Sequence, residues 1–93
     1  MKLEVITPNK GKEIDKEVCL LEAEGINGAF GILEGHIPFI TLLKDDGVIR
    51  FQTNSSNPIQ SIKVKEAILE TSASESNKKE SIVKIISSQI EEI

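Results

Sequence analysis

The sequence predicts an all-β protein, an antiparallel β-sandwich of about eight to ten short strands with little or no helix. Turn-forming Gly, Pro, Asn and Asp residues interrupt the apolar stretches about every 8–12 residues, a spacing typical of a sandwich. Isoleucine, valine and leucine dominate the hydrophobic 39% of the chain, and the β-branched residues among them favour strands. Because 93 residues suffice for one small domain, we expect a single domain over residues 1–93.

Apolar and polar residues alternate from the start of the chain. Leu3, Val5 and Thr7 alternate with three other residues and predict an opening strand. Composition indicates turns at residues 8–11 and 25–28. The strands expected in the first part of the chain therefore cover residues 2–7, 13–22 and 30–33.

The stretch from residue 28 to residue 43 organises the rest of the sequence. Three of the six glycines of the chain lie in it, at positions suited to sharp turns or close backbone contacts: Gly28, Gly31 and Gly35. Pro38 fixes φ and removes a donor, so residues 35–38 predict a corner. Residues 37–43 are almost wholly apolar, which predicts a strand buried on both faces.

The second half of the chain repeats the pattern of short strands and turns. Asp46 and Gly47 form a strong hairpin signal within a turn at residues 44–47. Strand character follows, and a polar, lysine-rich stretch is typical of a loop. We therefore expect strands over residues 48–52 and 62–69 and a loop over residues 72–81.

The last segment has two interpretations. Four isoleucines fit one face of a helix: Ile82, Ile86, Ile90 and Ile93. Residues 82–86 are nevertheless strongly β-branched, and this propensity favours a strand.

Charge and hydropathy limit the classes of partner. The net charge is −4 and the sequence pI is near 5.0, which disfavours nucleic acid because phosphate binding requires a basic surface. An acidic residue lies within the first five residues, unlike a signal peptide, and no apolar run approaches the ~20 residues of a membrane span. We therefore expect a soluble, intracellular protein that is at most peripheral to a membrane.

No residue pattern points to catalysis or to a bound metal. Cys19 is the only cysteine, so a disulfide within the chain is impossible, and its apolar neighbours predict a small buried residue. His36 is the only imidazole, and one His with one Cys cannot complete a zinc site. Asp45 and Asp46 are typical of solvated turn carboxylates. We expect no catalytic, cofactor-binding or metal-binding residues, and His36 has two interpretations, a corner residue bonded to backbone or an interface contact.

Residues 28–43 resemble the signature of the epsilon subunit of F-type ATP synthases. The resemblance extends over residues 1–52 and is weak beyond them. Ala29 replaces an acidic residue of that signature, and Glu34 replaces its proline. We expect no C-terminal helical hairpin of the kind that this family carries. The matching positions are Gly28, Phe30, Gly31, Ile32, Leu33, Gly35, His36, Pro38, Ile40, Thr41 and Leu43, followed by Gly47, Val48, Ile49 and Arg50.

The resemblance implies a non-catalytic sandwich that binds the gamma subunit in the central stalk, rests on the membrane c-ring and helps couple proton flow to ATP synthesis. It makes Gly28, Gly31 and His36 candidate contacts on the c-ring side, and Glu34 is a hypothetical replacement for the acid lost at Ala29. It also implies a peripheral place on the cytoplasmic face of the inner (plasma) membrane, no cofactor, and a strand for the last segment. The alternative function is a free-standing β-sandwich adaptor that binds another protein through the same corner.

Overall fold

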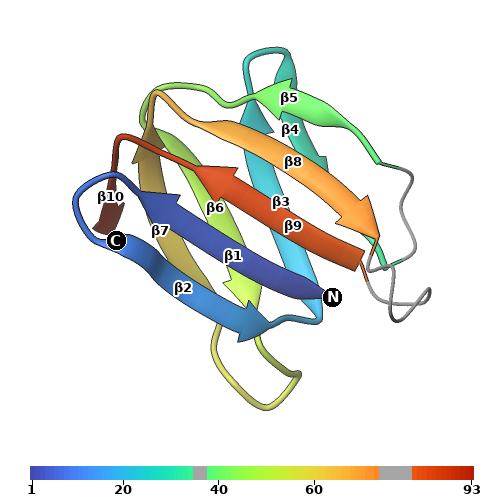
Figure 1. The fold of residues 1–93 in the computed structure, drawn as a ribbon. Coiled ribbons are helices and arrows are strands. Elements are labelled where there is room, and N and C mark those ends of the chain that lie inside the picture. The colour runs from blue at the N-terminus through green and yellow to red at the C-terminus, as the bar shows by residue number, and fades with distance from the viewer. Residues whose placement is uncertain (35–37, 74–80) are drawn as a thin grey trace.

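The computed structural model describes residues 1–34, 38–73 and 81–93. Within them, ten strands form two five-stranded sheets that pack face to face, as the sequence predicts (Figure 1). No helix in this described part of the chain is long and apolar enough to cross a membrane. The strands are β1 (Lys2–Thr7), β2 (Gly11–Glu17), β3 (Leu20–Gly25), β4 (Gly28–Gly31), β5 (Ile40–Leu42), β6 (Gly47–Gln52), β7 (Gln60–Lys65), β8 (Ile68–Ala73), β9 (Ser81–Ile86) and β10 (Gln89–Glu92).

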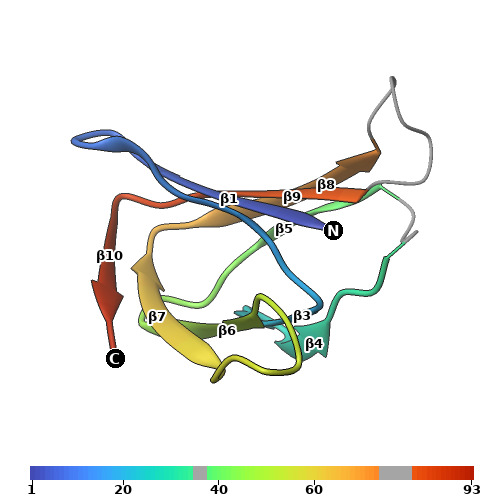
Figure 2. The ribbon, with the colours of Figure 1, turned by 90° about the horizontal axis from the view of Figure 1, so that it is seen from below.

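The chain repeatedly crosses from one sheet to the other. The first sheet has the order β2-β1-β9-β8-β5, and the second has the order β10-β7-β6-β3-β4. Within the first sheet β1 and β9 are parallel, while the other neighbouring strands of both sheets are antiparallel. Figure 2 shows the two layers edge-on, with β1, β8 and β9 in one and β3, β4 and β6 in the other. The two sheets are therefore connected by the chain at several points.

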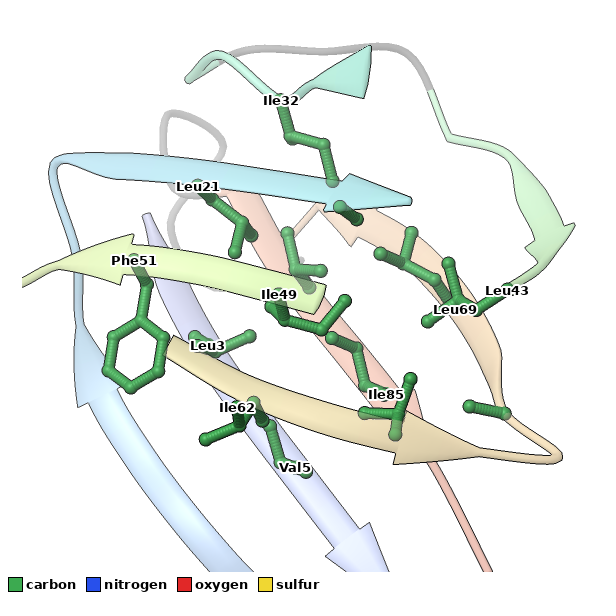
Figure 3. Packing of buried hydrophobic residues seen from close by; sticks show 14 of the residues in the cluster. Leu3, Val5, Leu21, Ile32, Leu43, Ile49, Phe51, Ile62, Leu69 and Ile85 are labelled. Atoms are coloured by element: carbon green, nitrogen blue, oxygen red, sulfur yellow. The ribbon is translucent and has the colours of Figure 1, made fainter. Parts of the chain in front are cut away.

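The core lies between the sheets and is almost entirely aliphatic. Every second residue of β1 and β3 is buried, as alternation in a half-buried strand requires. Figure 3 shows side chains from both sheets pointing toward one another, and Phe51 supplies the one aromatic ring among the largest fully buried side chains. Those side chains are Phe51, Leu3, Leu21, Ile32, Ile49, Leu69, Ile85, Val5, Val64, Val83 and Ser87.

The expected strand over residues 13–22 is wrong, because two strands cover this segment. β2 ends in the first sheet and β3 begins in the second, with Val18 and Cys19 at the crossing. The crossing buries Val18 to 4% exposure and turns Cys19 outward, so the predicted burial of Cys19 is also wrong. The Cys19 N–H donates to the carbonyl of Gln52 at 2.8 Å, which holds the crossing against β6.

The expected strand over residues 62–69 is also wrong, because β7 and β8 divide this segment between the two sheets. Glu66 lies between the two strands with a φ of 47°, a left-handed conformation that interrupts extended backbone.

The expected doubly buried strand at residues 37–43 is wrong as well. β5 has only three residues and lies at the edge of the first sheet, where it pairs with β8 alone. Ile40 is 68% exposed and Leu42 is 52% exposed, whereas Leu43, just past the strand, is buried. Each sheet of the sandwich has one covered face, so alternate side chains of β5 point outward and stay at the surface.

The last segment forms strands, as the sequence predicts, rather than a helix. β9 lies in the middle of the first sheet between β1 and β8, and β10 pairs with β7 in the second. Buried Ser87 joins them: the Lys65 N–H donates to its hydroxyl oxygen at 3.1 Å, and the hydroxyl lies 2.7 Å from the Gln89 carbonyl. These bonds satisfy the polar groups of a buried crossing.

The turn at residues 44–47 forms, but it joins β5 and β6 in opposite sheets and does not make a hairpin. Asp46 has a φ of 60°, and the Gly47 N–H donates to the Lys44 carbonyl at 2.8 Å. A Cβ at Gly47 would lie 2.6 Å from that carbonyl oxygen and 3.2 Å from the Glu24 carbonyl oxygen. Both neighbours are backbone atoms, so the turn has no room for a side chain.

Replacing Gly47 with alanine is therefore expected to destabilise the domain by about 1–3 kcal/mol, because the turn must move to relieve the clash. Thermal unfolding followed by circular dichroism should show the loss. Gly31→Ala is the matched control, since a Cβ there meets only the Leu21 carbonyl oxygen at 3.8 Å. Equal melting temperatures for Gly47→Ala and Gly31→Ala would contradict the packing described for this turn.

Candidate interaction surface

Two of the predicted interface residues share one edge strand. Gly28 opens β4 and Gly31 closes it, both are exposed, and β4 is the last strand of the second sheet. Gly28 has a φ of 129°, which few other residues adopt, so the β3–β4 turn requires a glycine at this position. Gly31 has no such requirement. His36 lies outside the described residues.

The Glu34 carboxylate binds two segments that are distant in the sequence. One carboxylate oxygen lies 2.6 Å from the N-terminal nitrogen of Met1, and the other accepts the Ser81 N–H at 2.7 Å. The Met1 nitrogen also lies 3.2 Å from the Glu17 carboxylate. The connection after β4 is thereby fixed to the beginnings of β1 and β9. Sequence reasoning placed Glu34 in an interface, and it could not anticipate a partner 47 positions away.

This ion pair shifts both pKa values. Burial lowers the pKa of the Met1 ammonium, but the hydrogen bonds to Glu34 and Glu17 outweigh it, so the pKa is raised above 8.0. The hydrogen bond from the ammonium outweighs burial at Glu34 and holds its pKa below 4.5. The ammonium contribution to stability is present below its unfolded pKa and is lost as pH rises through the folded value. The Glu34 contribution is present above its unfolded pKa and is lost as pH falls through the folded value.

Glu34→Gln is accordingly expected to cost stability mainly between about pH 5 and pH 8, where both groups are charged in the unfolded and folded chain. The loss should be modest, about 0.2–1 kcal/mol, because Glu34 is 47% exposed. Urea midpoints of the two proteins at a series of pH values measure it, and they should converge below pH 4 and at high pH. A difference that stays constant with pH would show that the ion pair does not contribute.

A row of aliphatic side chains crosses the outer face of the first sheet, and three of them are exposed while Ile6 is half-buried. We name it the apolar row, and its members are direct cross-strand neighbours on β5, β8, β9 and β1: Leu42, Ile68, Ile86 and Ile6. The first three are 52%, 43% and 50% exposed. The next row along the same face is mostly charged, because it contains Glu70, Lys84 and Glu4 beside Ile40. Contiguous exposed apolar patches are typical of interaction sites, so the apolar row is a candidate surface for contact with another macromolecule.

Sequence reasoning missed the apolar row because its members come from four separate strands. Their register could not be known in advance, and a slip of one residue would have turned each of them into the core. The sequence hints at the row only where two isoleucines are adjacent, as with Ile85 and Ile86. Successive residues of a strand point to opposite faces, so when one of the two is buried the other must face outward.

The polar residues that were candidates for catalysis or metal binding each make a separate structural contact or lie apart from the others. Asp45 accepts the Glu66 N–H at 2.9 Å, and the Asp46 carboxylate lies 3.6 Å from the Lys65 ammonium. Cys19 is at the β2–β3 crossing. Among the described residues, no group of three or more His, Cys, Asp or Glu side chains could hold a metal ion.

These features define a small β-sandwich domain that presents an apolar strip and a glycine-containing edge strand to its surroundings. Residues 1–92 match the family model of the β-sandwich domain of the ATP synthase delta/epsilon chain, and the chain belongs to this family.

Relatives by sequence carry the name ATP synthase epsilon chain. That of Geotalea daltonii is 45% identical over 56 residues, which are 53% of this chain and 40% of the relative. That of Psychrobacter arcticus is 51% identical over 39 residues, 42% of this chain and 28% of the relative. The matched part thus spans less than half the length of these relatives.

A solved structure supports the fold independently. A chain of the Euglena gracilis mitochondrial ATP synthase, in a structure comprising OSCP, F1 and the c-ring in rotational state 1, matches with a TM-score of 0.73 at 13% identity. The match covers 97% of the present chain and 51% of the Euglena chain. At this level of identity the likeness concerns the sandwich fold.

Proposed function

We propose that the chain is a central-stalk subunit of the rotor of an F-type ATP synthase, where it joins the gamma subunit to the membrane c-ring and supports the coupling of proton flow to ATP synthesis. Its own role is non-catalytic, and its place is peripheral, on the cytoplasmic face of the inner (plasma) membrane. Family membership supports the assembly, and the apolar row is the observation that carries the role of connector.

The gamma subunit is the partner assigned to the apolar row. Exposed Leu42, Ile68 and Ile86 form a strip on a stiff five-stranded sheet, and burying such a strip against a partner is favourable by about 25 cal/mol for each Å² of apolar surface covered. The centre of a stable protein interface is typically apolar with a polar rim. The charged row beside this strip supplies such a rim.

The c-ring is assigned to a different part of the molecule. Gly28 and Gly31 lie on the edge strand of the second sheet, whereas the apolar row lies on the outer face of the first. Exposed Ala29 sits between the two glycines, so a neighbouring chain can approach the β4 backbone closely. Glu34 and His36 follow along the chain toward β5. Gly28 and Ala29 line one open groove together with Leu42 and Ile68, so the proposed c-ring contact meets the apolar row at this end of the sandwich.

Co-purification with cross-linking tests the proposal. In a Cys19→Ser background, Ile68→Cys and Ala29→Cys are introduced separately, and the chain is co-expressed with the gamma and c subunits of its own organism. We expect a tagged chain to retain gamma, with Ile68→Cys cross-linking to gamma and Ala29→Cys to the c-ring. Recovery of neither subunit would overturn the proposal, and recovery of unrelated proteins through the same corner would favour the adaptor function.

A further inference from the structure

The β3–β4 turn carries an asparagine with a free side chain. Asn27 is exposed, as is Gly28, which follows it at the start of β4. Within the described part of the chain, the Asn27 side chain makes no hydrogen bond and no ion pair. A Cβ at Gly28 would meet no heavy atom within 4 Å, so the space around the bond between these two residues is open.

An asparagine that precedes a glycine can lose its side-chain amide without a cofactor. The main-chain nitrogen of the glycine gives its proton to solvent base and attacks the side-chain carbonyl carbon. A carbon–nitrogen bond forms and closes a succinimide ring, while the bond to the amide nitrogen breaks and ammonia leaves with a proton from water. Water then opens the ring at one carbonyl or the other, which gives isoaspartate or aspartate. Glycine favours the attack because no Cβ shields its nitrogen.

The Gly28 nitrogen lies at an end of the sheet that is weakly held. Gly28 pairs with Gly25 in the last register position of the β3–β4 ladder. β4 is an edge strand, and among the described strands its neighbour is β3 alone. Opening this end of the ladder therefore breaks few hydrogen bonds, and local opening of this kind has a low free-energy cost. It releases the Gly28 nitrogen for attack on the Asn27 side chain.

Two other asparagines that the structure describes lack this combination. Asn9 is followed by Lys10, whose side chain shields the main-chain nitrogen. The Oδ1 of Asn54 accepts the Ser56 N–H at 2.9 Å, which holds the side-chain amide against the backbone of its own turn. Reaction at Asn54 first requires the loss of this hydrogen bond.

Asn57 is held as well, and the residue after it cannot attack. Its Nδ2 donates to Thr53 Oγ1 at 2.7 Å, and Pro58 has no N–H to lose. Asn27 is thus the asparagine in the described part of the chain that has both a free amide and a glycine after it.

We propose that Asn27 is a site of spontaneous deamidation, at which the chain acquires aspartate or isoaspartate in the β3–β4 turn. The new carboxylate joins those of Glu24, Asp45 and Glu66 around the groove at this end of the sandwich, and isoaspartate adds a methylene to the main chain of the turn. Both changes occur next to Gly28, so the modification alters the edge that the proposed function gives to the c-ring. This last consequence rests on the proposed function, and the modification itself does not.

Peptide mapping by mass spectrometry, after incubation of the full chain in mildly alkaline buffer, tests the site. We expect Asn27 to be converted before the other asparagines that the structure describes, with both products present. The isoaspartyl product should accept a methyl group from S-adenosylmethionine when a protein isoaspartyl methyltransferase is added, and the same peptide of an Asn27→Gln chain should not. No conversion at Asn27, or conversion of Asn9 or Asn54 ahead of it, would overturn the proposal.

A second variant separates the structure of the turn from its sequence. Ser55→Gly gives Asn54 a glycine after it while the Asn54 amide stays bonded to the Ser56 N–H, and Ser55 is exposed, so the fold should persist. In the folded chain Asn54 of this variant should be converted severalfold more slowly than Asn27, whereas in urea the two rates should be similar. Equal rates in the folded chain would contradict the selection of Asn27 by its turn. Neither measurement requires gamma or the c-ring, so a failure here leaves the proposed function standing.

Discussion

Phe51→Ala is expected to remove about 3–5 kcal/mol of stability, because it deletes a ring that is 1% exposed and leaves a cavity between the sheets. Domains of this size have total stabilities of about 5–15 kcal/mol, so the loss is a large part of the whole. The melting temperature should fall by roughly 12–40 °C. Differential scanning calorimetry measures both the temperature and the enthalpy.

Phe51→Leu is the matched control for this cavity. It keeps an apolar side chain in the same place and should cost on the order of 1 kcal/mol. The large effect at one position follows from an unusual core, because no other aromatic ring is among the largest fully buried side chains. A melting temperature for Phe51→Ala within a few degrees of the parent would contradict the central place of this ring.

Ile68→Asp is expected to weaken the complex with gamma by at least about thirtyfold, because it places a carboxylate in the middle of an interface that covers the apolar row. Ile68 is 43% exposed in the free chain, so the fold should persist. Surface plasmon resonance with immobilised gamma measures the change, and the effect should appear mainly in the dissociation rate.

The control for Ile68→Asp is Ile59→Asp. Ile59 is 45% exposed and precedes β7, away from the outer face of the first sheet. The two changes have the same chemistry and similar exposure, so only the location differs. If both variants lower the affinity for gamma equally, the added charge acts nonspecifically. If neither variant lowers it, the gamma contact lies elsewhere.

The sequence predicted the architecture because local signals dominate it. Turn residues and the alternation of Leu3, Val5 and Thr7 depend on neighbouring positions alone, and these elements form where expected. The β-branched residues of the final segment favour a strand over a helix, and β9 forms there. The β2–β3 crossing was missed, since an apolar Val18 can end one strand or continue it equally well. Only the packing of the two sheets distinguishes these cases.

The position of a strand within its sheet was beyond local reasoning. The apolar segment before Leu43 has the composition of a central strand. β5 nevertheless lies at the edge of its sheet, with β8 as its neighbouring strand. Strand order depends on contacts between distant residues, and so does the apolar row that results from it. The tie from Glu34 to Ser81 has the same origin. His36 and its predicted contact remain a prediction, outside the described residues.

Hydroxyl-radical footprinting of the chain, alone and bound to gamma, tests the connector role most directly because it reports which side chains the partner covers. Oxidation of Leu42, Ile68 and Ile86 should fall severalfold in the complex, while that of Ile59 should stay the same. Unchanged oxidation of the apolar row in a complex that protects other residues would contradict the assignment of gamma to this face.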